Sequence, residues 1–288
     1  MKENLLDLSG KIDSIRLEAI EKIANLTQSY RIRFFIIGAA ARDMILSDGY
    51  GIQTIRATLD IDLGVRVPDW KQYKRLKQGL VKTGKFKENK EEHRLIYQNR
   101  LRIDLIPFGP ISDSEKNIRW LPEQEIVMSV LGFEESFRHS QIVRLRSNPV
   151  LDVRVVSLAG LALMKIISWN DKYPERDRDA IDLALIIKSY AEAGNSERIF
   201  NELTDLLEKD DFDYTAAGAR LLGRDIAVIL TPASKKVVLE ILDKETGDKM
   251  HFKLIEDMIK SNFESSGDFS NMLSLLEEMK TGIQERIS

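Results

Sequence analysis

The stretch Thr58-Leu59-Asp60-Ile61-Asp62-Leu63 alternates polar and apolar residues and carries two aspartates two positions apart. An alternation with a period of two predicts a β-strand, which we expect over residues 58–67 because Pro68 follows. Both carboxylates would then lie on one face of a sheet, with the apolar side chains facing a core. Neighbouring like charges repel, so the pattern favours a bound divalent cation. The alternative is a solvent-facing edge strand.

A third carboxylate lies in a second apolar stretch, Arg102-Ile103-Asp104-Leu105-Ile106, which also reads as a strand. Three carboxylates on neighbouring strands can hold two Mg²⁺ ions about 4 Å apart, an arrangement suited to in-line phosphoryl displacement. We therefore predict that Asp60, Asp62 and Asp104 are catalytic metal ligands, with two Mg²⁺ as the cofactor. The chain contains no cysteine and only three histidines, which favours a hard cation held by carboxylates.

A turn upstream of these aspartates predicts a phosphate-binding site. The apolar segment Phe34-Phe35-Ile36-Ile37 ends at Gly38, where a helix of small residues begins. Small side chains let a phosphate approach the free backbone N–H groups of a helix start. We expect Gly38, Ala39 and Arg42 to contact a nucleotide triphosphate. The alternative is a tightly packed strand-to-helix turn in which alanine is only a good helix former.

Lys165 is the single charged residue between Val156 and Asp171, inside an otherwise apolar helix. A buried ammonium needs an anionic partner. One hypothesis takes Lys165 across a cleft to the nucleotide phosphates, as both a catalytic and a nucleotide-binding residue. The other is an internal ion pair with Asp179 or Asp182.

Asp179 and Asp182 are three residues apart and share a helix face. They are candidate catalytic residues that position Lys165 or take a proton from the acceptor. The alternative is a set of surface salt bridges with Arg176, Arg178 and their neighbours.

The chain as a whole predicts an α+β protein in two parts. Residues 1–150 read as a mixed sheet with flanking helices, the catalytic domain, and residues 151–288 as a helical domain completing the active-site cleft. In the first part we expect a helix over 4–29, a basic helix from Asp69 to about Thr83, and a hairpin of 93–98 with 101–108. Further strands are expected near 125–133, 141–145 and 152–156. Later helices are expected near 157–171, 174–190, 194–208, 213–230, 233–243, 248–261 and 268–283.

Composition places the protein in the cytoplasm, away from membranes. The chain has 288 residues and a net charge of −3, and it contains neither an apolar run of membrane-spanning length nor a signal-like N-terminus. Charge is unevenly distributed, because residues 66–102 hold twelve Lys/Arg against four Asp/Glu. This basic segment is either a solvated helix face or a track for phosphates of a triphosphate or an RNA.

Taken together, the turn, the Asp-x-Asp strand and the third aspartate resemble the DNA polymerase β-type nucleotidyltransferase superfamily. The Gly38…Arg42-Asp43 spacing is similar to that of tRNA CCA-adding enzymes. The rest looks like the AbiEii/AbiGii-type nucleotidyltransferase toxins of bacterial type IV toxin–antitoxin systems, whose helical Lys and basic-Asp-x-x-Asp-Leu motif match Lys165 and Arg178–Leu183. The resemblance covers about residues 33–190. It departs at Ala39, where the family usually has Ser or Gly.

The resemblance implies an enzyme that transfers NMP from an NTP substrate to tRNA or a protein acceptor, with a cognate antitoxin protein as partner. A small-molecule, antibiotic-type nucleotidyltransferase would share the metal site and differ in its acceptor. A degenerate nucleotide-binding module without turnover is the non-catalytic alternative, and Ala39 is its best support.

Overall fold

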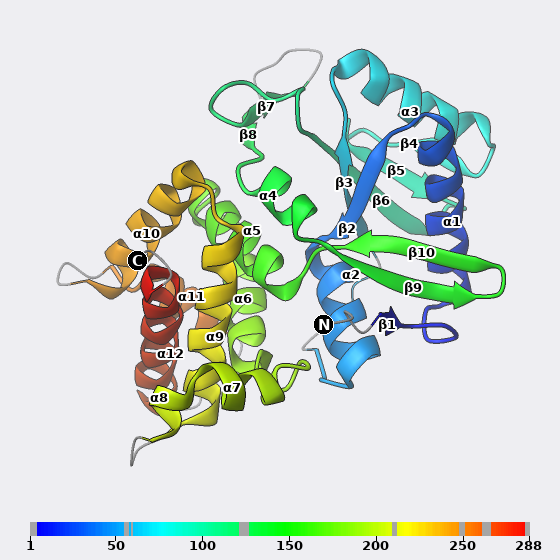
Figure 1. Cartoon of the computed structure of the whole chain (residues 1–288). Coiled ribbons are helices and arrows are strands. Elements are labelled where there is room, and N and C mark those ends of the chain that lie inside the picture. The colour runs from blue at the N-terminus through cyan, green and yellow to red at the C-terminus, as the bar shows by residue number, and fades with distance from the viewer. Residues whose placement is uncertain are drawn as a thin grey trace. The chain divides into compact units, whose positions relative to one another are not determined.

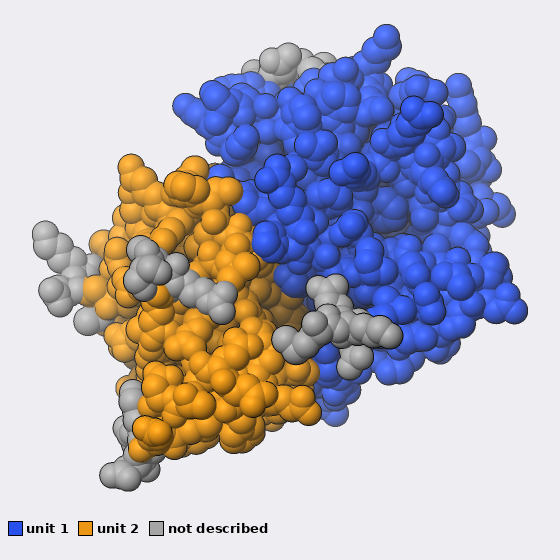
Figure 2. Space-filling view, in the orientation of Figure 1, with its two compact units in different colours: residues 1–157 blue, residues 158–288 orange. Residues whose placement is uncertain are grey.

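The computed structural model describes residues 5–54, 58, 60–120, 127–208, 212–247, 251–260 and 266–285. The chain forms two compact units, Met1–Ser157 and Leu158–Ser288, which are coloured separately in Figure 2. Every described strand lies in the first unit, and the described elements of the second unit are all helices. The predicted fold class, a mixed sheet with flanking helices followed by a helical part, is confirmed.

The first unit is built around one large mixed sheet (Figure 1). Its strands are β1 (Leu6–Asp7), β2 (Arg33–Ile37), β3 (Ile61–Arg66), β4 (Phe86–Glu88), β5 (Arg94–Tyr97), β6 (Leu101–Phe108), β9 (Gln141–Ser147) and β10 (Val150–Val155). Their order is β1-β9-β10-β2-β3-β6-β5-β4. At the centre, β3 runs antiparallel to β2 and parallel to β6. The candidate acidic strands are therefore immediate neighbours.

Helices and aromatic side chains cover this sheet. The helical elements are α1 (Ser14–Ser29), α2 (Gly38–Asp43) with its π-helical continuation η1 (Met44–Gly49), α3 (Trp70–Lys82) and α4 (Phe133–Arg138). The basic helix predicted from Asp69 is confirmed, and the Asp69 carboxylate caps it by accepting from the backbone N–H of Gln72 at 2.8 Å. Phe35, Phe108 and Phe137 meet with ring centroids 5.5–5.6 Å apart, which fixes β2, β6 and α4 in one core.

The N-terminal helix predicted over residues 4–29 is wrong at its start. The helix begins at Ser14, where the Asp13 carboxylate accepts from the backbone N–H of Arg16 at 3.0 Å. Leu6 and Asp7 instead form β1, which pairs parallel with β9. Local periodicity cannot show a partner strand about 135 positions away, so tertiary pairing overrode the helical pattern.

The strand predicted over residues 125–133 is also partly wrong. Within its described part, residues 127–133, only Val127–Ser129 is a strand, β8, which pairs with β7 (Asn117–Arg119) in a separate two-stranded sheet. Gly132 has φ +86° and precedes α4, so Phe133 belongs to a helix. Residues 121–126 lie outside the described residues. The strands predicted over 141–145 and 152–156 correspond to β9 and β10.

The second unit is a helical assembly. Its helices are α5 (Leu158–Asp171), α6 (Asp177–Ser189), α7 (Ser196–Glu202), α8 (Thr204–Leu207), α9 (Tyr214–Ile229), α10 (Pro232–Thr246), α11 (Lys253–Ile259) and α12 (Ser266–Glu285). The single helix predicted over 194–208 is two short helices, α7 and α8, separated by Leu203. No helix in the described part of the chain has the length and apolarity needed to cross a bilayer.

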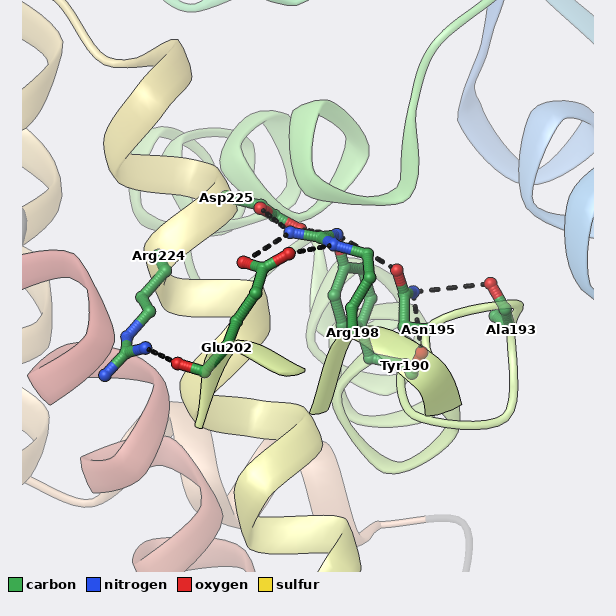
Figure 3. A network of polar contacts seen from close by, with 7 residues as sticks. All are labelled: Tyr190, Ala193, Asn195, Arg198, Glu202, Arg224 and Asp225. Atoms are coloured by element: carbon green, nitrogen blue, oxygen red, sulfur yellow. Dashed lines mark hydrogen bonds and ion pairs between the residues drawn. The ribbon is translucent and has the colours of Figure 1, made fainter. Parts of the chain in front are cut away.

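A polar network ties α6, α7 and α9 together (Figure 3). The Arg198 guanidinium donates to both oxygens of Asp225, at 2.7 and 2.8 Å, and to Glu202. The Tyr190 hydroxyl donates to the same Asp225 carboxylate. Burial raises the pKa of Tyr190 well above its ordinary value, and the Asp225 charge raises it further. Asp225 therefore anchors the end of α6 and the start of α7 on α9.

Candidate active site

Asp62 and Asp104 lie side by side at the centre of the sheet. In the parallel pairing of β3 with β6 they are direct register partners. Asp60 lies one residue before β3 rather than inside it, because the strand begins at Ile61 and not at the predicted position 58. Ile61 and Leu63 are fully buried, whereas Asp60 and Asp62 are half-buried. The register thus brings two of the three predicted metal ligands together, and the third stands two residues from Asp62.

The Asp104 carboxylate is held by a guanidinium. Arg94, which lies opposite Asp104 in the antiparallel pairing of β5 with β6, donates from Nε to Oδ1 and from Nη2 to Oδ2, each at 2.8 Å. The Asp104 side chain is 11% exposed. Hydrogen bonding to Asp104 raises the pKa of Arg94 above its ordinary value, so the guanidinium stays charged at every usable pH. Arg94 is not among the site residues predicted from the sequence.

His93 also lies near Asp104, with Nε2 3.8 Å from Oδ2. Burial lowers the pKa of His93, and the attraction of Asp104 only partly offsets this. The imidazole is therefore neutral near pH 7 and adds no second permanent cation to Asp104.

Gly38 leaves room for the Asp62 carboxylate. The backbone at Gly38 has φ +67°, and a Cβ placed there would lie 2.1 Å from Asp62 Oδ2. Both observations require glycine, because other residues rarely adopt this conformation and no side chain fits the gap. The strand-to-helix turn therefore touches the acidic strand, as Ile37 pairing with Asp62 also requires. Gly38 and Ala39 are half-buried, so part of the turn remains accessible.

Arg42 lies in a different setting from the one predicted. Its side chain is 2% exposed and donates from Nε and Nη2 to Asp43 Oδ1, at 2.9 and 2.6 Å. A guanidinium that is buried and already donates to a neighbouring carboxylate is poorly placed to bind a triphosphate. Asp43 in turn accepts the backbone N–H of Thr58 through Oδ2 at 3.1 Å. The Arg42–Asp43 pair therefore braces the segment that leads to Asp60, whose N–H donates to the Thr58 hydroxyl at 3.2 Å.

Lys165, Asp179 and Asp182 form one buried cluster inside the second unit. The Lys165 ammonium donates to Asp179 Oδ1 at 2.7 Å and to Asp182 Oδ2 at 2.6 Å, and all three side chains are at most 10% exposed. Arg176 also donates to Asp179 at 2.7 Å. Burial alone would lower the pKa of Lys165, but attraction to the two carboxylates outweighs it and the pKa is raised.

Burial likewise opposes ionisation of Asp179, but the charges of Lys165 and Arg176 lower its pKa below the ordinary value. Lys165 and Asp179 are thus both charged near neutral pH. These contacts match the internal ion pair, which was the alternative for Lys165. A role of this cluster in nucleotide binding stays a prediction.

Among the described residues, no group of three or more His, Asp or Glu side chains is already assembled to hold a metal ion. The geometry explains this for two of the candidates. Asp104 is turned onto Arg94, and Asp60, whose side chain is 37% exposed, lies 3.7 Å from the guanidinium of Arg102. The carboxylates of Asp104 and Asp60 therefore each face a guanidinium of the protein itself.

Comparison with known proteins settles the family. A family model described as "Nucleotidyl transferase AbiEii toxin, Type IV TA system" matches residues 44–266, more than half of the chain. The chain belongs to the AbiEii family. It is accordingly a nucleotidyltransferase, as its sequence predicted, and the matched region of this AbiEii protein includes β3, β6 and the Lys165 cluster. No curated protein sequence matches the chain.

Several solved structures are similar to this AbiEii protein at low identity. The antibiotic-resistance factor ANT(2'')-Ia in solution is 13% identical, with 68% of this chain and 97% of that chain covered and a TM-score of 0.37. The lincosamide antibiotic adenylyltransferase LnuA, lincomycin-bound, is 14% identical, with 59% and 94% covered and a TM-score of 0.35. The Thermotoga maritima CCA-adding enzyme complexed with tRNA is 13% identical, with 95% and 70% covered and a TM-score of 0.34.

Proposed function

We propose that this enzyme transfers NMP from an NTP to an RNA acceptor, in a reaction that depends on a divalent cation held by Asp62, Asp104 and Asp60. The observation that carries the proposal is the register of β3 and β6, which pairs Asp62 with Asp104. Like charges in direct register destabilise a sheet unless a cation separates them. Such a pair at the centre of a sheet, where apolar residues usually pack, supports a functional reason for its presence.

The donor set suits Mg²⁺. Carboxylate oxygens are the ligands that this hard cation prefers, and the described site offers no thiolate that would select a softer metal. The Asp62 carboxylate occupies the space beside Gly38 that a Cβ at this position would fill. A divalent cation held by these carboxylates would neutralise charge on a triphosphate and on its pyrophosphate leaving group.

The residues of the chain have separate tasks in this proposal. Asp62 and Asp104 provide the paired carboxylates, and Asp60 adds a third from the segment braced by Asp43. The turn at Gly38 and Ala39 approaches the triphosphate through its backbone. Its N-cap residue, Ile37, has an apolar side chain that makes no cap hydrogen bond to α2.

The basic segment supports a polyanionic acceptor. Its exposed cationic side chains, on α3, β4, the adjoining turns and the start of β6, are Lys71, Lys74, Arg75, Lys82, Lys85, Lys87, Lys90, Arg100 and Arg102. By contrast, Lys77 is buried and donates to Glu92. A set of exposed cations attracts phosphates and gives binding that weakens as salt rises. This charge favours RNA, tRNA included, over a protein or an uncharged small molecule.

The family description, a toxin of a type IV TA system, supports a toxin with a cognate antitoxin protein as partner. We expect this toxin to act in the cytoplasm. This role is part of our proposal. It predicts growth arrest on expression of the chain alone and recovery on co-expression of the antitoxin.

The experiment that tests the function follows the label of an NTP. Purified protein, Mg²⁺ and total bacterial RNA are incubated with each of the four NTPs labelled at the α-phosphate or at the γ-phosphate. We expect α-label, and no γ-label, in a product that ribonuclease destroys and protease leaves intact. If label appears instead in protein, or in an aminoglycoside supplied in place of RNA, that molecule and not RNA is the acceptor. Binding of an NTP with Mg²⁺ but no transfer of label to any acceptor would favour the degenerate nucleotide-binding module, for which Ala39 is the best support.

A further inference from the structure

The strongest unassigned feature of the candidate site is the bidentate contact between Arg94 and Asp104. We propose that Arg94 is an internal counter-cation that neutralises Asp104 in the metal-free enzyme, so that the site takes up its divalent cation efficiently only together with the triphosphate. This inference rests on the proposed function. It assigns to Arg94, a residue of β5, control over when the metal site is complete.

The geometry shows that Arg94 is built for this contact. It lies directly opposite Asp104 in the β5–β6 ladder, and the backbone N–H of Leu105 donates to the His93 carbonyl at 2.8 Å beside it. The two parallel N–H···O contacts at 2.8 Å form a fork that matches a carboxylate. The backbones of β5 and β6 hold the two side chains opposite each other, so this ion pair is better positioned than a pair of two long, mobile surface side chains.

Charge arithmetic explains the consequence. Asp60, Asp62 and Asp104 carry three negative charges within one short stretch of neighbouring strands. A +1 guanidinium on Asp104 removes part of the repulsion and lets the strands pair without metal. The same charge repels an incoming divalent cation, because both oxygens of Asp104 already accept an N–H. A triphosphate brings about four negative charges of its own, and these offset the repulsion.

Arg102 adds to this effect but is weaker. Its Nη1 is 3.7 Å from Asp60 Oδ2 and its side chain is 59% exposed, so solvent screens the contact. Arg94 is 21% exposed and forms the tighter pair. The inference therefore assigns the main effect to Arg94.

A matched control exists in the same sheet. Arg144 on β9 lies opposite Asp152 on β10, and its Nε and Nη2 donate to Oδ1 and Oδ2, each at 2.9 Å. This pair copies the Arg94–Asp104 geometry at two strands that carry none of the candidate ligands. Arg144→Gln should therefore reproduce the loss of one cross-strand ion pair without any effect on metal uptake.

The test measures binding of Mn²⁺, a paramagnetic substitute for Mg²⁺, by the loss of the free-ion EPR signal, with and without a non-hydrolysable NTP. We expect wild-type protein to bind Mn²⁺ weakly alone and tightly with nucleotide. Arg94→Gln should tighten nucleotide-free binding by at least about tenfold, Arg94→Lys by less than about threefold, and Arg144→Gln not at all. The gain should disappear in the double variant Arg94→Gln/Asp104→Asn.

Thermal unfolding gives a second readout that covers a poorly folding variant. Arg94→Gln should lose stability without metal and regain it with Mn²⁺, whereas Arg144→Gln should regain none. Nucleotide-free Mn²⁺ affinity that stays unchanged or falls in Arg94→Gln would overturn the inference, as would a variant that Mn²⁺ cannot restore. Absence of Mn²⁺ binding by wild-type protein even with NTP would instead refute the proposed function.

Discussion

Replacing Lys165 with methionine tests how the buried cluster of the second unit contributes to stability. Methionine keeps most of the length and volume of the lysine side chain but removes the ammonium that both Asp179 and Asp182 accept from. Removing one partner of a buried ion pair costs about 3–5 kcal/mol, because the remaining charge stays buried and unpaired. Arg176 still contacts Asp179 and covers part of the deficit, so we expect a loss near the lower end.

The loss should depend on pH with a definite sign. The pKa of Asp179 is lowered in the folded protein, so its stabilisation is present above its unfolded pKa and is lost as the pH falls through the lowered value. In Lys165→Met the Asp179 carboxylate loses part of this support and takes up a proton more easily. The difference in stability between variant and wild type should therefore be largest near pH 7 and shrink near pH 4. The raised pKa of Lys165 keeps the wild-type ammonium charged over this whole range.

The assay is differential scanning calorimetry, which can separate transitions of the two units. A loss of about 3 kcal/mol corresponds to a fall of roughly 6–12 °C in the transition of the helical unit. The control is Lys236→Met, because the Lys236 side chain is 78% exposed and its Nζ is 4.0 Å from Glu240, a contact that should be worth less than about 0.5 kcal/mol. A Lys165→Met transition within about 2 °C of wild type, combined with loss of NTP binding, would refute the internal ion pair and restore Lys165 to the nucleotide site.

Two further substitutions test separate contacts. Gly38→Ala should cost about 1–2 kcal/mol of backbone strain and should also displace the Asp62 carboxylate, so NTP-dependent metal binding should fall at least about tenfold. In the control Gly51→Ala, where φ is +72° and no atom of the described residues lies within 4 Å of the new Cβ, only stability should fall. Equal metal binding by both variants would contradict the role of Gly38. Arg198→Ala leaves the Asp225 carboxylate without its bidentate partner and should lower the free energy of unfolding of the helical unit by about 1–2 kcal/mol in urea unfolding. The value is this small because Arg198 is partly exposed. An unchanged urea midpoint would contradict the anchoring role of Asp225 between α6, α7 and α9.

Local sequence patterns predicted the parts of the site that depend on a single segment. The Asp-x-Asp alternation, the apolar strand ending at Gly38 and the cap at Asp69 are each determined within a few residues, and the structure contains all three elements. The pairing of Asp62 with Asp104 agrees with the expected neighbouring strands because both segments are apolar enough to be central strands.

Contacts that depend on register were outside the reach of the same patterns. The hairpin of β5 and β6 was predicted across Asn99-Arg100, but its loop spans three residues, because Tyr97 pairs with Leu101. A two-residue loop would place Leu95 opposite Asp104, and the observed loop places Arg94 there. Since a shift of one residue moves every side chain to the other face, the counter-cation of Asp104 could not be found without the loop geometry.

The burial of Arg42 could not be predicted from the sequence for a related reason, and its contact with a nucleotide stays a prediction. Its spacing from Gly38 suggests a phosphate contact, but its burial depends on Asp43 and on the segment at Thr58, which comes from elsewhere in the chain. The sequence gives the charge of such a residue, whereas only packing decides whether that charge reaches a ligand or a neighbour.

The most direct test of the central claim is the rate of pyrophosphate release from NTP in the presence of the RNA acceptor, for Asp62→Asn and for Asp152→Asn. Asn keeps the size of the Asp62 side chain beside Gly38 but removes the charge that would hold the cation. Asp152 lies on β10, away from β3, and pairs with Arg144. We predict that Asp62→Asn releases pyrophosphate at least about 10³-fold more slowly than wild type, equivalent to about 4 kcal/mol, and that Asp152→Asn stays within about twofold. Release by Asp62→Asn within tenfold of the wild-type rate would contradict a metal-dependent transfer at this pair of strands.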